Sequence, residues 1–102
     1  MFGVYERVTI FFDNYVSEIE FPYAIDIEDF DDYIVITSNV AIPDMKRGWI
    51  GDIIFKLSGA NITDGSPTDD AYVTMKEVLC SNCKFETKYD RAIEWQYKFL
   101  KY

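Results

Sequence analysis

The chain has 102 residues, of which 49% are hydrophobic and 18% are aromatic, and its formal net charge is −8 at pH 7. The hydrophobic content excludes an intrinsically disordered chain, and the length predicts a single domain, residues 1–102, with a core of its own. The negative charge disfavours direct binding to nucleic acid, and because the chain has no histidine, the commonest general base is absent.

Alternating apolar residues predict β-strands along most of the chain, and the aromatic content also favours strands. The first segment has on one face, with Glu6 interrupting it, Phe2, Val4, Val8, Ile10 and Phe12. From Ser17 to Ile27 the apolar residues occupy the odd positions, Ile19, Phe21, Tyr23, Ile25 and Ile27. Pro22 cannot donate to a β-ladder, so we expect this second strand at a sheet edge.

Three later segments show the same period of two. Within residues 33–42 one face carries Ile34, Ile36, Val40 and Ile42. Residues 49–57 place Trp49, Ile53, Phe55 and Leu57 together, which predicts that Trp49 belongs to the core. The last segment alternates with polar residues and contains Ile93, Trp95, Tyr97 and Phe99. Turn-forming residues predict turns or loops at 13–14, 28–32, 43–48, 59–70 and 80–82.

The segment 71–79 has two interpretations. Ser66 and Pro67 resemble a helix start, and Met75 and Val78 would share one helical face. Val73 and its neighbours are poor helix formers, which favours a strand. The predicted fold is mainly β, a single-domain antiparallel sandwich or small barrel of about six to seven strands with room for one short helix near 67–80; an α+β fold is the alternative.

The negative charge is concentrated in the first 45 residues, where ten of the eighteen acidic residues lie with a single basic residue, Arg7. Charge at this density on one region favours a basic partner. Acids on the predicted edge strand and in the following turn, with two aromatic anchors among them, form what we call the acidic ridge. The predicted partner-binding residues are Glu18, Glu20, Asp26, Glu28, Asp29, Phe30, Asp31, Asp32 and Tyr33.

The acidic ridge has three interpretations. Charges on an edge strand prevent edge-to-edge aggregation and need no partner. Alternatively, the ridge docks on a basic protein, and mimicry of a nucleic acid is one form of such docking. A divalent-cation loop at residues 26–32 is disfavoured, because the segment contains no glycine and the spacing of an EF-hand fails.

Cys80 and Cys83 form a lone C-x-x-C pair. Structural zinc needs four ligands, so such a site would require a second subunit, and a redox motif requires a strand-to-helix context. We expect structural thiols in a turn, with no metal and no cofactor. Two cysteines do not make a disulfide framework, and no signal-peptide pattern or membrane-spanning run is present in the sequence, so we expect a cytoplasmic protein. The loop 59–70 ranks second as a contact surface.

Catalysis is not supported, because no nucleophile–histidine pair and no phosphate-binding glycine motif occurs. The sequence predicts a non-catalytic acidic protein, a monomer or homodimer, that inhibits a basic protein partner by occupying its basic surface, with no direct nucleic-acid or membrane contact. In size, acidity and lack of catalytic residues it resembles phage-encoded inhibitors of host defence and the immunity proteins of toxins; this likeness of class assigns no residue roles. The alternative is a small structural subunit, such as a phage particle component, that self-associates through strand edges.

Overall fold

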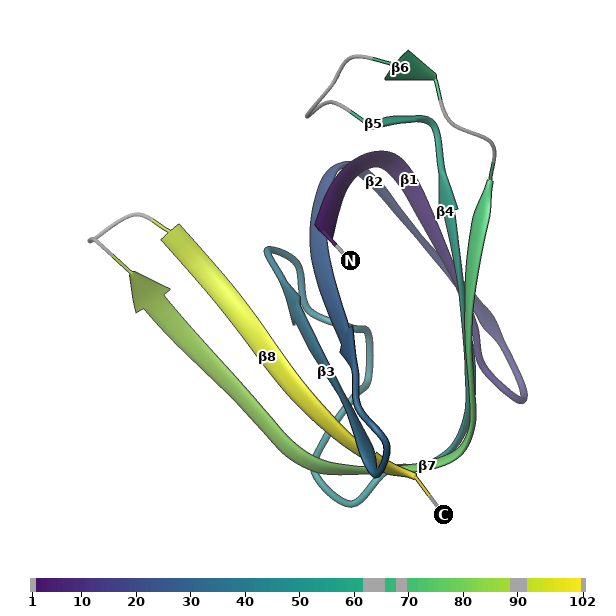
Figure 1. The fold of residues 1–102 in the computed structure, drawn as a ribbon, viewed down its shortest axis with the longest axis vertical. Helices are drawn as coiled ribbons and strands as arrows, with labels where there is room; N and C mark the ends of the chain where they lie inside the picture. Colours follow the sequence, from purple (N-terminus) through teal and green to yellow (C-terminus); the bar gives the residue numbers. More distant parts are fainter. Residues whose placement is uncertain (1, 62–65, 68–69, 89–91, 102) are drawn as a thin grey trace.

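The computed structural model describes residues 2–61, 66–67, 70–88 and 92–101, and all regular structure in these residues is β-strand. The six barrel strands are β1 (Phe2–Phe11), β2 (Val16–Asp29), β3 (Tyr33–Ser38), β4 (Ile50–Ser58), β7 (Ala71–Lys88) and β8 (Ala92–Lys101). A short pair, β5 (Ala60–Asn61) and β6 (Ser66–Pro67), lies outside the barrel (Figure 1). The predicted mainly β fold is confirmed as a barrel. Residues 71–79 are strand, so the helix and the α+β alternative were wrong.

The barrel is closed in the order β1-β2-β3-β8-β7-β4, and every neighbouring pair is antiparallel. The first three strands form consecutive hairpins, and the chain then returns to place β4 beside β1. The spatial order β4-β1-β2-β3 is that of a Greek key. Closure leaves few strand edges unpaired, and the unpaired edges that remain among the described residues include parts of β2 and β7.

The core lies inside the barrel and is built from the alternating positions that the sequence indicates. In β3 the burial pattern alternates strictly, and in β4 the residues Ile53, Phe55 and Leu57 are fully buried. Trp49 precedes β4 and is half-buried; it packs against this core and is not part of it, so its predicted core position is confirmed only in part. The largest fully buried side chains are Tyr23, Tyr97, Phe55, Phe99, Ile10, Ile25, Ile36, Ile42, Ile53, Leu57, Met75 and Val8.

A β-bulge reverses the alternation within β1. The pairing of β1 with β2 shifts register between Tyr5 and Arg7, where two residues of β2, Phe21 and Pro22, lie opposite the single residue Glu6. Across this irregularity the side chains of β1 change faces. Val8 is buried as predicted, whereas before the bulge Tyr5 is buried and Val4 is only half-buried. The expectation that Val4 and Val8 share the core face was therefore wrong.

The same bulge explains Pro22 in β2. Residues 16–20 and 23–26 of β2 pair with β1, so Pro22 falls between the two paired stretches. On its other side β2 pairs with β3 only from Ile25 to Asp29. Pro22 therefore lies where no ladder partner needs its missing N–H, as is usual for proline in a sheet. The predicted edge position is confirmed for residues 16–23 and wrong for residues 25–26, which pair on both sides.

Two irregularities allow β7 to change partners along its length. Residues 71–79 pair with β4 and residues 78–88 with β8. The register with β4 shifts next to Glu77, which has a φ of 53° and whose N–H donates to Asp52 Oδ1 at 2.7 Å. The register with β8 shifts between Cys80 and Asn82. The turn predicted at 80–82 was wrong, because a bulge accommodates these polar residues without ending the strand.

The connection from β3 to β4 is held to the barrel by side chains. The N–H of Ala24 donates to Asn39 Oδ1 at 2.9 Å, and the N–H of Ile42 donates to the hydroxyl of Tyr97 at 2.9 Å. Tyr23, also in the core, has a buried hydroxyl that makes no hydrogen bond of ordinary length with the described residues; it interacts only weakly with Ser38, whose own hydroxyl donates to the carbonyl of Val40 at 2.8 Å. Burial raises the pKa of both tyrosines to about 12. Within the described part of the chain, no helix has the length and apolar character to cross a membrane.

Candidate protein interface at the β2–β3 turn

The turn between β2 and β3 is a tight hairpin with an aromatic pair at its base. The N–H of Phe30 donates to the carbonyl of Tyr33 at 2.9 Å, which closes the turn around Asp31 and Asp32. The rings of Phe30 and Tyr33 stack with centroids 4.7 Å apart. Lys98 Nζ lies over the Tyr33 ring, 4.5 Å from its centroid. Tyr33 is thus held between two neighbours, while Phe30 remains 40% exposed.

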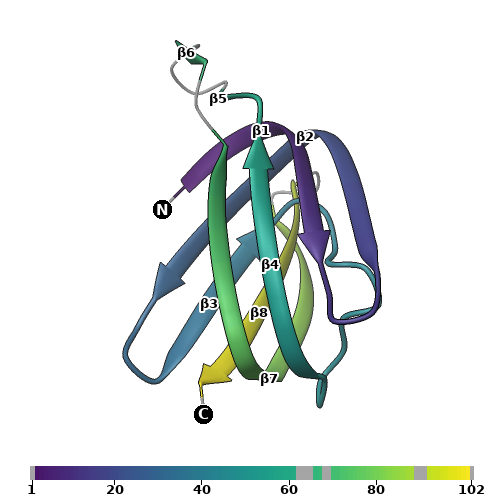
Figure 2. The same ribbon diagram turned by 90° about the vertical axis from the view of Figure 1, so that its right-hand side faces the viewer.

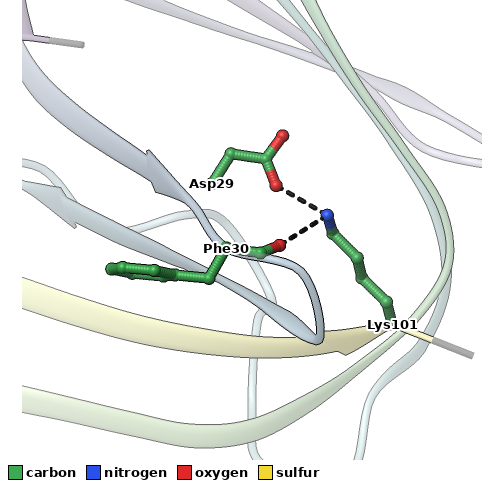
Figure 3. Close-up of polar contacts among 3 residues, drawn as sticks. All are labelled: Asp29, Phe30 and Lys101. Atoms are coloured by element: carbon green, nitrogen blue, oxygen red, sulfur yellow. Dashed lines mark hydrogen bonds and ion pairs between the residues drawn. The ribbon is translucent and has the colours of Figure 1, made fainter.

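Lys101, at the end of β8, fixes the base of this turn (Figure 3). Its Nζ donates to Asp29 Oδ1 at 2.6 Å and to the carbonyl of Phe30 at 2.7 Å, and its N–H donates to the carbonyl of Asp32 at 3.0 Å. Figure 3 shows the Phe30 ring extending away from the Lys101 ammonium group. The charge of Asp29 is therefore balanced within the chain.

Three carboxylates around the turn are exposed and unpaired. Glu28, Asp31 and Asp32 form no side-chain hydrogen bond or ion pair with any part of the chain that the structure describes. These three acids, with Phe30 and Tyr33, make up what we call the acidic tip. It presents negative charge around a partly exposed aromatic ring.

The remaining members of the acidic ridge lie elsewhere. Asp26 is half-buried within β2. Glu18 and Glu20 are exposed near the β1–β2 turn, and Glu18 Oε1 accepts an ion pair from Arg7 Nε at 2.8 Å. Figure 2 shows β2 arching over the barrel, so that the β1–β2 turn and the β2–β3 turn lie on opposite sides of the view. The barrel thus brings only the turn residues together, and the predicted ridge is not one continuous surface.

Sequence reasoning did not identify Lys98 and Lys101 as neighbours of the acidic turn. The register of β3 with β8 places Tyr33 opposite Leu100, which puts both lysines beside a segment far away in the sequence. The polar positions of the last predicted strand were a signal that these lysines lie on the outer face. Which strand lies beside it depends on the barrel order, which strand patterns do not contain.

The cysteines show no sign of a reactive site in their surroundings. Both are free thiols; Cys80 is buried in the core and Cys83 is half-buried, and both lie within β7 and not in the predicted turn. Burial, with a smaller contribution from Cys83, raises the pKa of Cys80 to about 11. Burial also raises the pKa of Cys83. Both thiols are therefore protonated at neutral pH and are poor nucleophiles.

Two other expectations concern metal ligands and the second loop. Among the residues that the structure describes, no three His, Cys, Asp or Glu side chains are grouped so as to hold a metal ion. Half of the loop 59–70 lies outside the described residues, which include only the short strands β5 and β6 and the flanking residues 59 and 70.

Comparison with protein-family models, with curated proteins and with solved structures gave no significant match. Function is therefore inferred from the residues described above.

Proposed function

We propose that this chain is a non-catalytic, cytoplasmic binding protein that inhibits a basic protein partner by placing the acidic tip on the partner's functional surface. The observation that carries this proposal is the combination of unpaired, exposed carboxylates with an exposed aromatic ring at one hairpin turn. Elsewhere on the ridge, Glu18 and Asp29 are already engaged by Arg7 and Lys101.

The two kinds of side chain serve different steps of binding. Exposed carboxylates attract a basic surface over a distance and raise the rate of association. An aromatic ring that becomes buried in the complex mainly sets the rate of dissociation. The Lys101 contacts to Asp29 and Phe30 hold the turn in one conformation before binding, which reduces the ordering cost on association. If the partner's basic surface binds nucleic acid, the tip competes with nucleic acid for it.

Binding kinetics with a partner isolated by affinity capture test this proposal. The double variant D31N/D32N should slow association and flatten its dependence on salt, because the steering charge is reduced. The variant F30A should accelerate dissociation, with a loss of about 2 kcal/mol if Phe30 is a hot spot. The matched control D13N/D70N removes the same charge far from the tip and should change both rates little. Equal effects of the tip variants and the control would contradict the proposal.

A second function, a self-assembling structural subunit, is favoured by one observation. Residues 16–20 and 23 of β2 pair only with β1 among the strands described, so the other edge of this part of β2 is open. Open edges are sites where strands of another copy can add. Sedimentation analysis distinguishes the two functions, since a ring or a higher oligomer would favour the structural subunit and a monomer or dimer favours the inhibitor.

A further inference from the structure

The β7–β8 hairpin extends beyond the barrel as a two-stranded arm (Figure 1). We define the arm as residues 81–88 of β7 and residues 92–95 of β8. β8 pairs with β3 only from Trp95 onward, and β4 pairs with β7 only up to Leu79. The outer part of the arm is therefore supported by neither neighbouring strand, and a two-stranded ribbon alone is marginally stable in water.

The outer edge of the arm is open. The last described contacts on this side of β7 are the backbone hydrogen bonds of Cys80 with Gly48 and Trp49, each 2.8 Å. Beyond them, no described strand pairs with the outer edge of residues 81–88. Every second residue of such an edge directs its N–H and C=O outward. On one face of the arm, Phe85 is 50% exposed and its ring lies 4.9 Å from that of Trp95.

We propose that this edge pairs with the same edge of a second copy of the chain, in an antiparallel, two-fold symmetric dimer. A register centred on Phe85 places Lys84 of each copy opposite position 86 of the other, which is Glu86. Positions 84 and 86 alternate with position 85 along β7, so the two-fold junction aligns a lysine position with a glutamate position twice, once on each side of Phe85. The self-complementary order Lys-Phe-Glu is what an isologous interface requires.

On the other face of the arm, the dimer would bring together Phe85 and Trp95 of both copies. In this register the two Phe85 side chains are direct cross-strand neighbours, each already in contact with Trp95 of its own chain. Aromatic pairs across strands stabilise a sheet beyond the area that they bury. The two arms become a four-stranded sheet, which supports the part of the hairpin that the barrel leaves unsupported.

The open edge of β2 provides the contrast. The equivalent self-pairing centred on Ile19 would place Glu18 of each copy opposite Glu20 of the other, so that like charges face each other. Pro22 adds a residue that cannot donate to a new ladder. Of these two open edges, that of β2 is unsuited to two-fold pairing with its own copy, although a different strand can still add to it, whereas that of the arm is self-complementary. The dimer is independent of the acidic tip, so its test does not depend on the proposed function.

Sedimentation velocity over a range of concentrations up to about 1 mM tests the dimer. The wild-type protein should show a concentration-dependent dimer. The single reversals K84E and E86K each place like charges opposite one another and should raise the dimer dissociation constant by roughly tenfold or more. The double reversal K84E/E86K restores opposite charges and should restore the wild-type constant. An equimolar mixture of the two single variants should associate more tightly than either variant alone.

A control variant separates the interface from a general effect of charge. K76E makes the same charge change on the exposed surface of β7 outside the arm and should leave the dissociation constant unchanged. Circular dichroism should show the same β spectrum for all variants. A wild-type protein that remains monomeric throughout would overturn the proposal, and so would a dimer that responds equally to K84E, E86K and K76E.

Discussion

Two buried tyrosines illustrate at the residue scale how a hydroxyl group acts in this core. The hydroxyl of Tyr97 accepts the N–H of Ile42, whereas the hydroxyl of Tyr23 makes no hydrogen bond of ordinary length with the described residues and interacts only weakly with Ser38. A buried N–H that loses its acceptor is left desolvated without a hydrogen bond, which lowers stability. Removing a hydroxyl that makes no hydrogen bond leaves no other group in that state.

We therefore expect opposite effects from two chemically identical substitutions. Y97F should lower the free energy of unfolding by about 1–3 kcal/mol, because the N–H of Ile42 is left without an acceptor. Y23F should leave it unchanged or raise it, since the hydroxyl is buried without compensation. Urea denaturation with comparison of midpoints at constant slope measures both. A greater loss for Y23F than for Y97F would show that the Tyr23 hydroxyl has an unrecognised partner.

At the scale of one strand, the bend of β7 depends on Glu77 in the left-handed region, with a φ of 53°. A residue with a Cβ is strained there, whereas glycine is not. E77G should therefore raise the free energy of unfolding by about 1 kcal/mol. The neighbouring Lys76 is not in the left-handed region, so K76G should lower the free energy of unfolding by about 0.5–1 kcal/mol. Thermal and urea unfolding of the two variants measure the difference, and the same sign for both would contradict a strained bulge.

The strands could be predicted from the sequence because inward and outward side chains alternate in a barrel as in any half-buried sheet. The bulges could not. Each involves an extra residue in one strand that shifts the register, and Val4 was assigned to the wrong face because in the sequence Glu6 resembles an isolated exception to the alternation and not the position of a register shift. The helix alternative for residues 71–79 failed because pairing with β4 outweighed weak helix signals.

For the whole molecule, closure of the barrel decides which charges become neighbours. The sequence places no lysine or arginine between Arg7 and Lys46, yet the acidic turn contacts Lys98 and Lys101 from the last strand. Closure also separates Glu18 from the turn, although β2 carries both. The acidic tip was thus predictable as a turn with aromatic anchors. The strand order was needed to show which acids belong to it and that Lys98 and Lys101 lie beside it.

The net charge of −8 on a molecule measuring 37 × 33 × 26 Å predicts how salt acts on stability. Exposed ion pairs such as Arg7–Glu18 and Lys56–Asp70 contribute little, while unpaired acids repel one another through water. Raising sodium chloride from about 10 mM to about 100 mM shortens the Debye length from about 30 Å to about 10 Å. We expect Tm to rise by a few degrees, since about 1 kcal/mol moves Tm by about 4–8 °C in a domain of this size.

The variant D31N/D32N serves as the control for this experiment. It has a less negative net charge, so its Tm should rise less over the same salt range. Association with a basic partner should respond in the opposite direction, because screening that relieves repulsion within the chain also weakens attraction between the tip and its target. If Tm falls as salt is added, attraction within the exposed ion pairs exceeds the repulsion among the acids. The unpaired carboxylates of the tip then do not destabilise the free protein, and a basic partner would relieve no repulsion by binding them.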